Sequence, residues 1–146
     1  AYEMLRSLVG SEMCIRDSAY TSKAQTLVNL NRPQEALGVC DLACRKDPQS
    51  PYPHVSRAVA LTSLGRMEEA DEEYRRALAL DPENDIVNYN YACFWASVGD
   101  EEKCRCYLEK ALQLQPKTHT VAAVDEDFAP YRDREWFQNL VAFKRH

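Results

Sequence analysis

Hydrophobic and polar residues alternate with helical spacing through the middle of the chain. Between residues 51 and 82 the apolar residues recur every three or four positions, so that they share one side of a helix. This pattern predicts one helix over residues 52–65 and a second over 67–82. The inner faces are expected to carry Leu61, Leu64, Ala70, Tyr74, Ala77 and Leu78. A solvated outer face, or alternatively a docking patch, is expected to carry Glu68, Glu69, Asp71, Glu72, Glu73, Arg75 and Arg76.

The pattern repeats with a period of 34 residues. Small residues let two helix axes approach to roughly 8–10 Å, and a proline just past a helix stops it from continuing. A glycine or asparagine tolerates the positive φ of a turn between helices. The repeated columns are Ala24, Ala58, Ala92; Ala36, Ala70, Cys104; Ala43, Ala77, Ala111; Pro48, Pro82, Pro116; and Asn31, Gly65, Gly99. They predict three antiparallel helix pairs.

These columns resemble those of the tetratricopeptide repeat family, whose period is 34 residues. Repeats that begin at Asp17, Pro51 and Asp85 meet nearly all of the family pattern of small residues, a large residue and a final proline. The departures are Cys104, Cys40, Leu108, Lys23 and Arg57, and the two long cations can lay their stems on the core with the charge in water. The resemblance implies an all-α, right-handed helical-repeat solenoid with repeats at 17–50, 51–84 and 85–118.

The first eighteen residues lack the repeat columns. Residues 12–18 can be back-translated to a string that resembles the mosaic-end adapter of transposase-based sequencing libraries. We therefore expect residues 1–18 to be a translated adapter, and the chain to be a fragment without its natural N-terminus. The alternative is a genuine leader helix built on Met4, Leu5, Leu8 and Val9.

Residues 117–146 are expected to cap the last repeat, because a stack of helix pairs leaves its final apolar face bare. The segment resembles the closing motif of bacterial repeat arrays through Asp125, Glu126, Asp127, Phe128, Pro130, Tyr131 and Arg132. Asp133 is expected to cap the final helix. The residues expected to cover the apolar face, or alternatively to bind a partner, are Phe128, Trp136, Phe137, Leu140 and Val141.

Charge and composition narrow the possible partners. The chain is 45% hydrophobic and 28% charged with a net charge of −5, which gives no electrostatic footprint for nucleic acid or an anionic membrane. RNA recognition by related helical-pair repeats is therefore disfavoured. No apolar run approaches the roughly 20 residues that span a bilayer. We expect a cytoplasmic protein.

No catalytic or metal-binding pattern stands out among the reactive side chains. The cysteines do not have the CxxC spacing of a zinc site, and His54, His119 and His146 are scattered. The chain has four glycines and no phosphate-binding loop. We expect no enzymatic activity, no cofactor and no metal, with free thiols among Cys14, Cys40, Cys44, Cys93, Cys104 and Cys106.

The resemblance places function on the concave surface of the solenoid, which in this family commonly holds a peptide or a partner helix. Tyr91 and Trp95 are expected in the core, whereas Tyr52, Tyr89 and Asn90 are expected to be exposed at the centre of the groove. By repeat position, the residues expected to contact a partner are Gln25, Asn29, Tyr52, Val55, Ser56, Val59, Ile86, Tyr89, Asn90 and Cys93.

One subclass of the family grips the C-terminal carboxylate of chaperones with cationic residues. The corresponding positions here carry no cation, so no carboxylate clamp is expected; they are Thr21, Gln25, Ser56, Ile86 and Asn90. The leading hypothesis is a non-catalytic scaffold or adaptor that binds another protein or peptide. The alternative is the C-terminal regulatory or substrate-presenting segment of a larger enzyme, such as a kinase, cyclase, protease or transferase.

Overall fold

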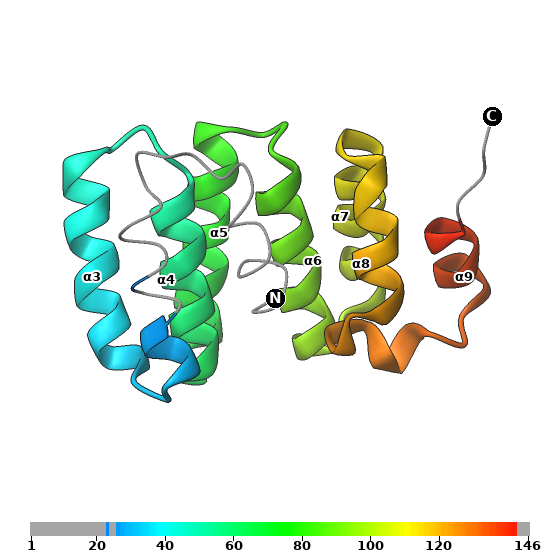
Figure 1. Cartoon of the computed structure of the whole chain (residues 1–146), viewed down its shortest axis with the longest axis horizontal. Helices are drawn as coiled ribbons and strands as arrows, with labels where there is room; N and C mark the ends of the chain where they lie inside the picture. The colour runs from blue at the N-terminus through cyan, green and yellow to red at the C-terminus, as the bar shows by residue number, and fades with distance from the viewer. Residues whose placement is uncertain (1–22, 24–25, 143–146) are drawn as a thin grey trace. The chain divides into compact units, whose positions relative to one another are not determined.

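The computed structural model describes residues 23 and 26–142, and every regular element in this part of the chain is a helix. The predicted leader at residues 1–18 and the predicted binding residue Gln25 lie outside the described residues. Residues 26–29 are helical. The elements that follow are α3 (Pro33–Lys46), α4 (Tyr52–Ser63), α5 (Met67–Leu80), α6 (Asp85–Val98), α7 (Glu101–Leu114), η1 (Pro116–Thr118), α8 (His119–Val124), η2 (Glu126–Tyr131) and α9 (Glu135–Val141), as drawn in Figure 1. The all-α prediction is confirmed for these residues.

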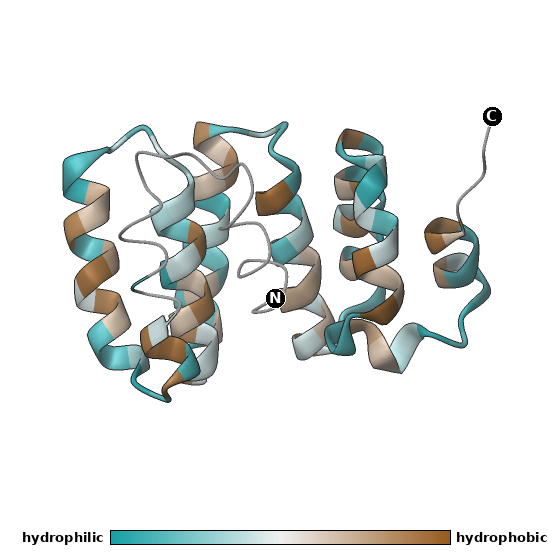
Figure 2. Ribbon diagram, viewed as in Figure 1, coloured by the Kyte–Doolittle hydropathy of each residue, from teal (hydrophilic) through white to brown (hydrophobic). Residues whose placement is uncertain are grey.

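The described chain divides into two compact units, one ending at Pro82 and the other beginning at Glu83. The N-terminal unit contains α3, α4 and α5, and the C-terminal unit contains the elements from α6 to α9. Apolar and polar residues alternate along the helices of both units (Figure 2). Each unit therefore buries amphipathic helices against one another.

In the N-terminal unit, α4 and α5 form an antiparallel pair. Ala58, Ala70 and Ala77 have no exposed surface, as expected for small residues that let helices pack closely. α3 begins with Pro33, whose fixed φ suits the first turn and whose missing N–H would have no partner there.

In the C-terminal unit, α6 and α7 form a second pair. Asn84 caps α6 by accepting a hydrogen bond from the Val87 N–H at 3.1 Å, and Asp100 caps α7 by accepting from the Lys103 N–H at 3.1 Å. Cys104 stands in a column of alanines and is likewise fully buried. A cysteine is therefore accommodated at this position, where the other two repeats have alanine.

The turn column behaves as its residue types predict. Asn31, Gly65 and Gly99 have φ values of 60°, 76° and 92°, and no other described residue has a positive φ. Asparagine and glycine adopt this left-handed conformation at low cost. The sequence prediction of a turn at each of these positions is confirmed.

Aromatic side chains fill much of the core of the C-terminal unit. Tyr91 and Trp95 are 2% and 9% exposed, which confirms their predicted place in the core. The ring of Tyr91 lies 4.4 Å from that of Tyr107 on α7, measured between centroids. Lys103 places its Nζ 4.2 Å from the centroid of the Trp95 ring.

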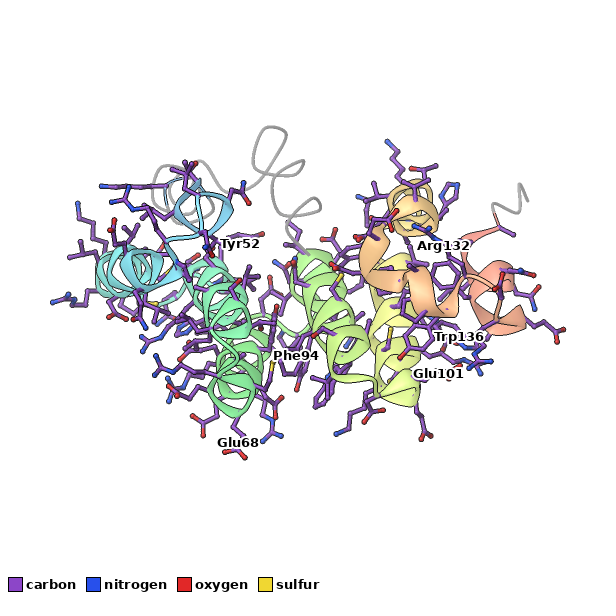
Figure 3. The ribbon with its side chains drawn as sticks, turned by 90° about the horizontal axis from the view of Figure 1, so that it is seen from below. Tyr52, Glu68, Phe94, Glu101, Arg132 and Trp136 are labelled. Atoms are coloured by element: carbon purple, nitrogen blue, oxygen red, sulfur yellow. The ribbon has the colours of Figure 1, made fainter. Side chains whose placement is uncertain are left out.

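The segment after α7 folds against α6 and α7 within the C-terminal unit. Phe128 and Phe137 are buried, with ring centroids 5.9 Å apart. Trp136 donates from Nε1 to Glu101 Oε1 at 2.8 Å, and Figure 3 shows these two side chains beside each other. The predicted N-cap at Asp133 is wrong, because the N-cap position of α9 is Arg134 and no side chain caps it.

One residue of the predicted outer face of α5 is buried instead. Glu73 is 4% exposed, so its assignment to the solvated face is wrong. Its carboxylate lies 2.7 Å from His54 Nδ1 on α4 and accepts a hydrogen bond from Arg76 Nη1 at 2.9 Å. Arg57 also points its guanidinium at Glu73 and bonds Asp41 on α3. These partners explain the burial, because a buried charge needs opposite charges and hydrogen bonds.

Candidate functional site

The predicted binding residues lie on the first helix of each repeat. Asn29 belongs to the helical residues 26–29, and the others divide between α4 and α6. Within α4 and α6 they follow the spacing i, i+3, i+4, i+7 and so share one face of the helix. On α4 they are Tyr52, Val55, Ser56 and Val59, and on α6 they are Ile86, Tyr89, Asn90 and Cys93.

Most of these side chains are buried. Asn29 is exposed and Tyr52 is half-buried, whereas the residues on α4 and α6 that follow Tyr52 are all buried. Tyr89 and Asn90 are both 0% exposed, so the prediction that they are exposed is wrong. The helical period assigns these residues to one face of each helix, but it carries no information on what covers that face.

Tyr89 is held by the C-terminal segment. Its hydroxyl donates to Asp125 Oδ2 at 2.7 Å, and its ring meets Phe128 edge-on, with the planes at 88°. Burial raises the pKa of the Tyr89 phenol, and the neighbouring thiol of Cys93 and carboxylate of Asp125 raise it further. Tyr89 is therefore a structural residue that fixes the start of η2 against α6.

Two buried oxygen atoms on the predicted face have no hydrogen-bond partner. They are Ser56 Oγ on α4 and Asn90 Oδ1 on α6. Asn90 uses its Nδ2 to donate to the Ile86 carbonyl at 2.9 Å, which leaves its oxygen unpaired. Both residues stand sixth in their 34-residue repeat. Such atoms are uncommon in folded proteins, since each costs about 1–3 kcal/mol of desolvation without a compensating bond.

One thiol and two carboxylates come together in the C-terminal unit. The Sγ of Cys93 and one carboxylate oxygen each of Asp125 and Asp127 all lie within 4.8 Å of one another. Asp125 Oδ1 accepts from the Asp127 N–H at 3.0 Å, which fixes the turn into η2. Sequence reasoning assigned these aspartates only to the cap; the acidic motif at 125–127 was the signal that could have pointed to a charged site.

The thiols do not have the properties of nucleophiles. Burial raises the pKa of Cys40, Cys93 and Cys104 to about 12 in each case. A nucleophilic cysteine instead has a pKa near or below neutral, because the thiolate is the reactive form. At pH 7 these three side chains are therefore protonated and behave as small buried hydrophobic groups.

His54 and Glu73 resemble an acid–base pair only by distance. Burial by itself would raise the pKa of Glu73, but the hydrogen bond from His54 and the charges of His54, Arg57 and Arg76 outweigh burial and lower it. The carboxylate is thus ionised and held between α4 and α5. These charged groups therefore stabilise the packing of α4 against α5 in the N-terminal unit.

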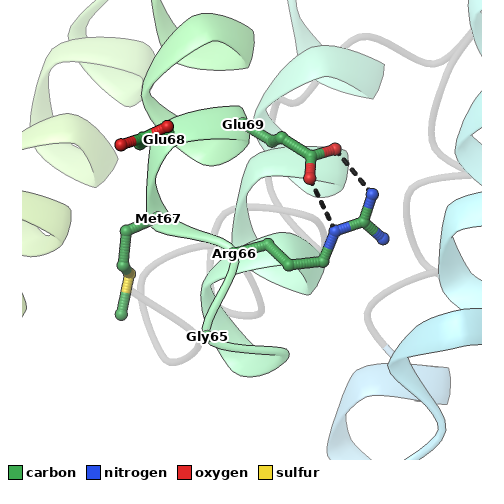
Figure 4. Close-up of a pocket in the computed structure, with 5 residues that line it drawn as sticks. All are labelled: Gly65, Arg66, Met67, Glu68 and Glu69. Carbon is green, nitrogen blue, oxygen red and sulfur yellow. Dashed lines mark hydrogen bonds and ion pairs between the residues drawn. The ribbon is translucent and has the colours of Figure 1, made fainter.

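An open depression at the turn between α4 and α5 is lined by Gly65, Arg66, Met67, Glu68 and Glu69 (Figure 4). Arg66 donates from Nε and Nη2 to the two oxygens of Glu69 at 2.8 and 2.6 Å. The guanidinium is therefore already occupied by a carboxylate. The depression offers no free cation for an anionic ligand.

Comparison with known proteins shows what this chain is similar to in sequence and in fold. Residues 51–84 match the family model of the tetratricopeptide repeat. A search of curated proteins by sequence found no significant match. Among the described residues, no helix combines the length and apolar character needed to cross a membrane.

Several solved structures share the architecture. PilF of Pseudomonas aeruginosa is 26% identical with a TM-score of 0.70, and the match covers 86% of this chain and 60% of that one. YrrB, described as a TPR protein with an unusual peptide-binding site, is 23% identical with a TM-score of 0.57 over 79% of this chain and 59% of its own. The chain thus spans about three fifths of both proteins.

The translocator chaperone SycD of the Yersinia enterocolitica type III secretion system has the same fold at 14% identity. Its TM-score is 0.60, and the match covers 89% of this chain and 96% of that chain. The chain therefore contains one segment, residues 51–84, that matches the tetratricopeptide repeat model, and it shares the fold of these solved structures.

Proposed function

We propose that the chain is a non-catalytic protein-interaction module that binds peptide segments of a partner, through the predicted face of α4 in the N-terminal unit and, separately, through that of α6 in the C-terminal unit. Tyr89 is withdrawn from the proposed contacts because it holds the C-terminal segment. The remaining described contacts are Asn29, Tyr52, Val55, Ser56, Val59, Ile86, Asn90 and Cys93.

The unpaired oxygens of Ser56 and Asn90 carry this proposal. Each is an acceptor buried on a helix face, and an extended peptide offers a backbone N–H donor at every residue except proline. A bond to such a donor would remove the desolvation penalty that each oxygen now bears. Val55 and Val59 flank Ser56 on α4 and make its surroundings apolar. Side-chain acceptors beside apolar residues suit recognition of a peptide backbone.

The raised pKa values of the buried thiols support a non-catalytic role, because they leave the cysteines protonated at neutral pH. The peptide-binding site named for YrrB and the chaperone role named for SycD support protein interaction as the function class. Neither identifies a partner for this chain.

The substitution Ser56→Ala tests the proposal because it moves stability and binding in opposite directions. Loss of an unpaired buried hydroxyl should leave the free energy of unfolding unchanged or raise it by up to about 1–3 kcal/mol. Loss of an acceptor for the peptide should weaken binding by about two- to tenfold, the effect of one neutral hydrogen bond. Peptides for the assay are selected from a random library displayed on phage, and affinity is measured by calorimetry on the full chain.

Thr62→Val is the matched control on the same helix. It also removes a hydroxyl from α4, but the Thr62 Oγ1 already donates to the Ala58 carbonyl at 2.8 Å, on a different face from Ser56. Binding should survive this change. Equal peptide affinity in wild type and Ser56→Ala, or an equal loss in both variants, would refute the proposed contact.

A further inference from the structure

The indole nitrogen of Trp95 is a buried donor without an acceptor. Trp95 lies near the C-terminal end of α6 and is 9% exposed, and its Nε1 has no hydrogen-bond partner among the described residues. Such donors are uncommon in folded proteins, because nothing compensates for their desolvation. Trp136 shows the usual arrangement, since its Nε1 donates to Glu101 Oε1 at 2.8 Å. An acceptor placed at the Trp95 N–H would therefore be stabilising.

The ammonium group of Lys103 lies over the same ring. Its Nζ, in the first turn of α7, is 4.2 Å from the centroid of the Trp95 ring. Because Nε1 is an atom of that ring, the two nitrogens are close neighbours. The carboxylate of Asp100 places Oδ2 3.9 Å from the Lys103 Nζ. This distance exceeds the roughly 2.7–3.2 Å of a hydrogen bond, so Asp100 uses none of the three ammonium donors.

We propose that Trp95 and Lys103 form a binding site for the side-chain carboxylate of an aspartate or glutamate in a partner protein. A carboxylate accepts at two oxygens and donates none, so one oxygen can take the indole N–H and the other the ammonium group. Trp95 follows Ile86 by nine positions, which places it on the opposite side of α6 at 3.6 residues per turn. The site therefore goes beyond the proposed function.

Lys103 controls access to the indole ring. The rings of Tyr91 and Phe94 contact Trp95 and are only 2% and 3% exposed, whereas the Lys103 side chain is 54% exposed. A long exposed side chain changes rotamer within about nanoseconds. Lys103 can therefore leave the ring while the buried neighbours stay in place. Binding of a carboxylate then replaces a cation–π contact at the surface with charge-assisted hydrogen bonds, which are the stronger interaction.

Other ligand groups fit this pair less well. A neutral carbonyl oxygen would satisfy the indole N–H but would leave the charge of Lys103 without a partner. A phosphate group carries close to two negative charges at neutral pH, and the acidic side chains of Asp100 and Glu102 beside Lys103 oppose the second charge. A cation would be repelled by Lys103 itself. A carboxylate brings a single negative charge on a flat group with two acceptors.

The two indole N–H signals of the isotope-labelled full chain test this inference by nuclear magnetic resonance. The probe is Nα-acetyl-glutamate amide, and the control probe is Nα-acetyl-glutamine amide, which replaces the carboxylate with a neutral amide. We expect the glutamate probe to shift the Trp95 indole signal saturably. The Trp136 indole signal should stay in place, because that N–H is already bonded to Glu101. The glutamine probe should give no response at the same concentrations.

Three variants of the C-terminal unit sharpen the test. Lys103→Gln should weaken binding of the glutamate probe at least about tenfold, the effect of losing a charge-assisted bond. Lys110→Gln is the matched control, since it removes the same charge from the same helix at a residue that pairs with Glu83 at 3.3 Å; the affinity should stay within about twofold. Asp100→Asn should strengthen binding about twofold or more, because asparagine keeps an oxygen to cap α7 but loses the competing charge.

Three results would overturn the inference. They are an equal response to the glutamine probe, a shift of the Trp136 indole signal in place of the Trp95 signal, and an affinity that survives Lys103→Gln. None of these measurements involves Ser56 or Asn90. The inference can therefore fail while the proposed function stands.

Discussion

Tyr89 joins α6 to the C-terminal segment through one hydrogen bond and one ring contact. The hydroxyl lies 2.7 Å from Asp125 Oδ2, and the ring stands edge-on to Phe128. Both partners follow the last repeat in sequence, so the helical period of α6 alone assigns Tyr89 to a face without revealing what covers it. Glu73 shows the same limit, since its partners His54 and Arg57 come from another helix.

Tyr89→Phe should destabilise the chain by about 1–3 kcal/mol, because it removes one donor from a buried carboxylate while keeping the ring contact. Chemical unfolding monitored by circular dichroism measures the change. Tyr131→Phe is the control, since it removes a hydroxyl from η2 without touching the bond to Asp125. Equal stability of Tyr89→Phe and wild type would show that the hydroxyl does not hold the segment.

At the scale of the element, the turn after the first helix of a repeat depends on backbone conformation. Gly99 ends α6 in the left-handed region at φ 92°, and its N–H bonds the Trp95 carbonyl at 3.0 Å. Sequence predicts such turns well because few residue types tolerate positive φ. The start of α9 is harder to predict, since Arg134 takes the N-cap position with an extended backbone and its side chain does not cap the helix.

Two glycine substitutions should change stability in opposite directions. A Cβ added at Gly99 or at Gly38 would meet no neighbouring atom within 4 Å, so only backbone preference differs between them. Gly99→Ala should cost about 1–2 kcal/mol, because alanine is strained at positive φ. Gly38→Ala, inside α3, should stabilise by about 0.5–1 kcal/mol, because alanine loses less backbone entropy. Thermal melts measure both, and a Gly99→Ala variant as stable as wild type would contradict the turn assignment.

At the scale of the whole molecule, the 34-residue period predicts the helices, the small-residue contacts and the positive-φ turns. These features depend on residue type at fixed spacing, which the sequence states directly. Burial of Glu73 and Tyr89 depends on contacts between elements, and Cys93 meets Asp125 and Asp127 from more than 30 positions away in the sequence. Local periodicity contains no information about such contacts, so the polar groups that matter for the proposed function were only partly predicted.

The most direct test of peptide binding is to map a library-selected peptide onto the isotope-labelled full chain by nuclear magnetic resonance. The account predicts saturable shifts of the Ser56 and Asn90 amides and their neighbours on the same faces of α4 and α6. The exposed charged residues of α5, such as Glu68 and Glu72, should keep their resonance positions. Shifts confined to the outer face of α5, or the failure of every selected peptide to bind in solution, would contradict the account.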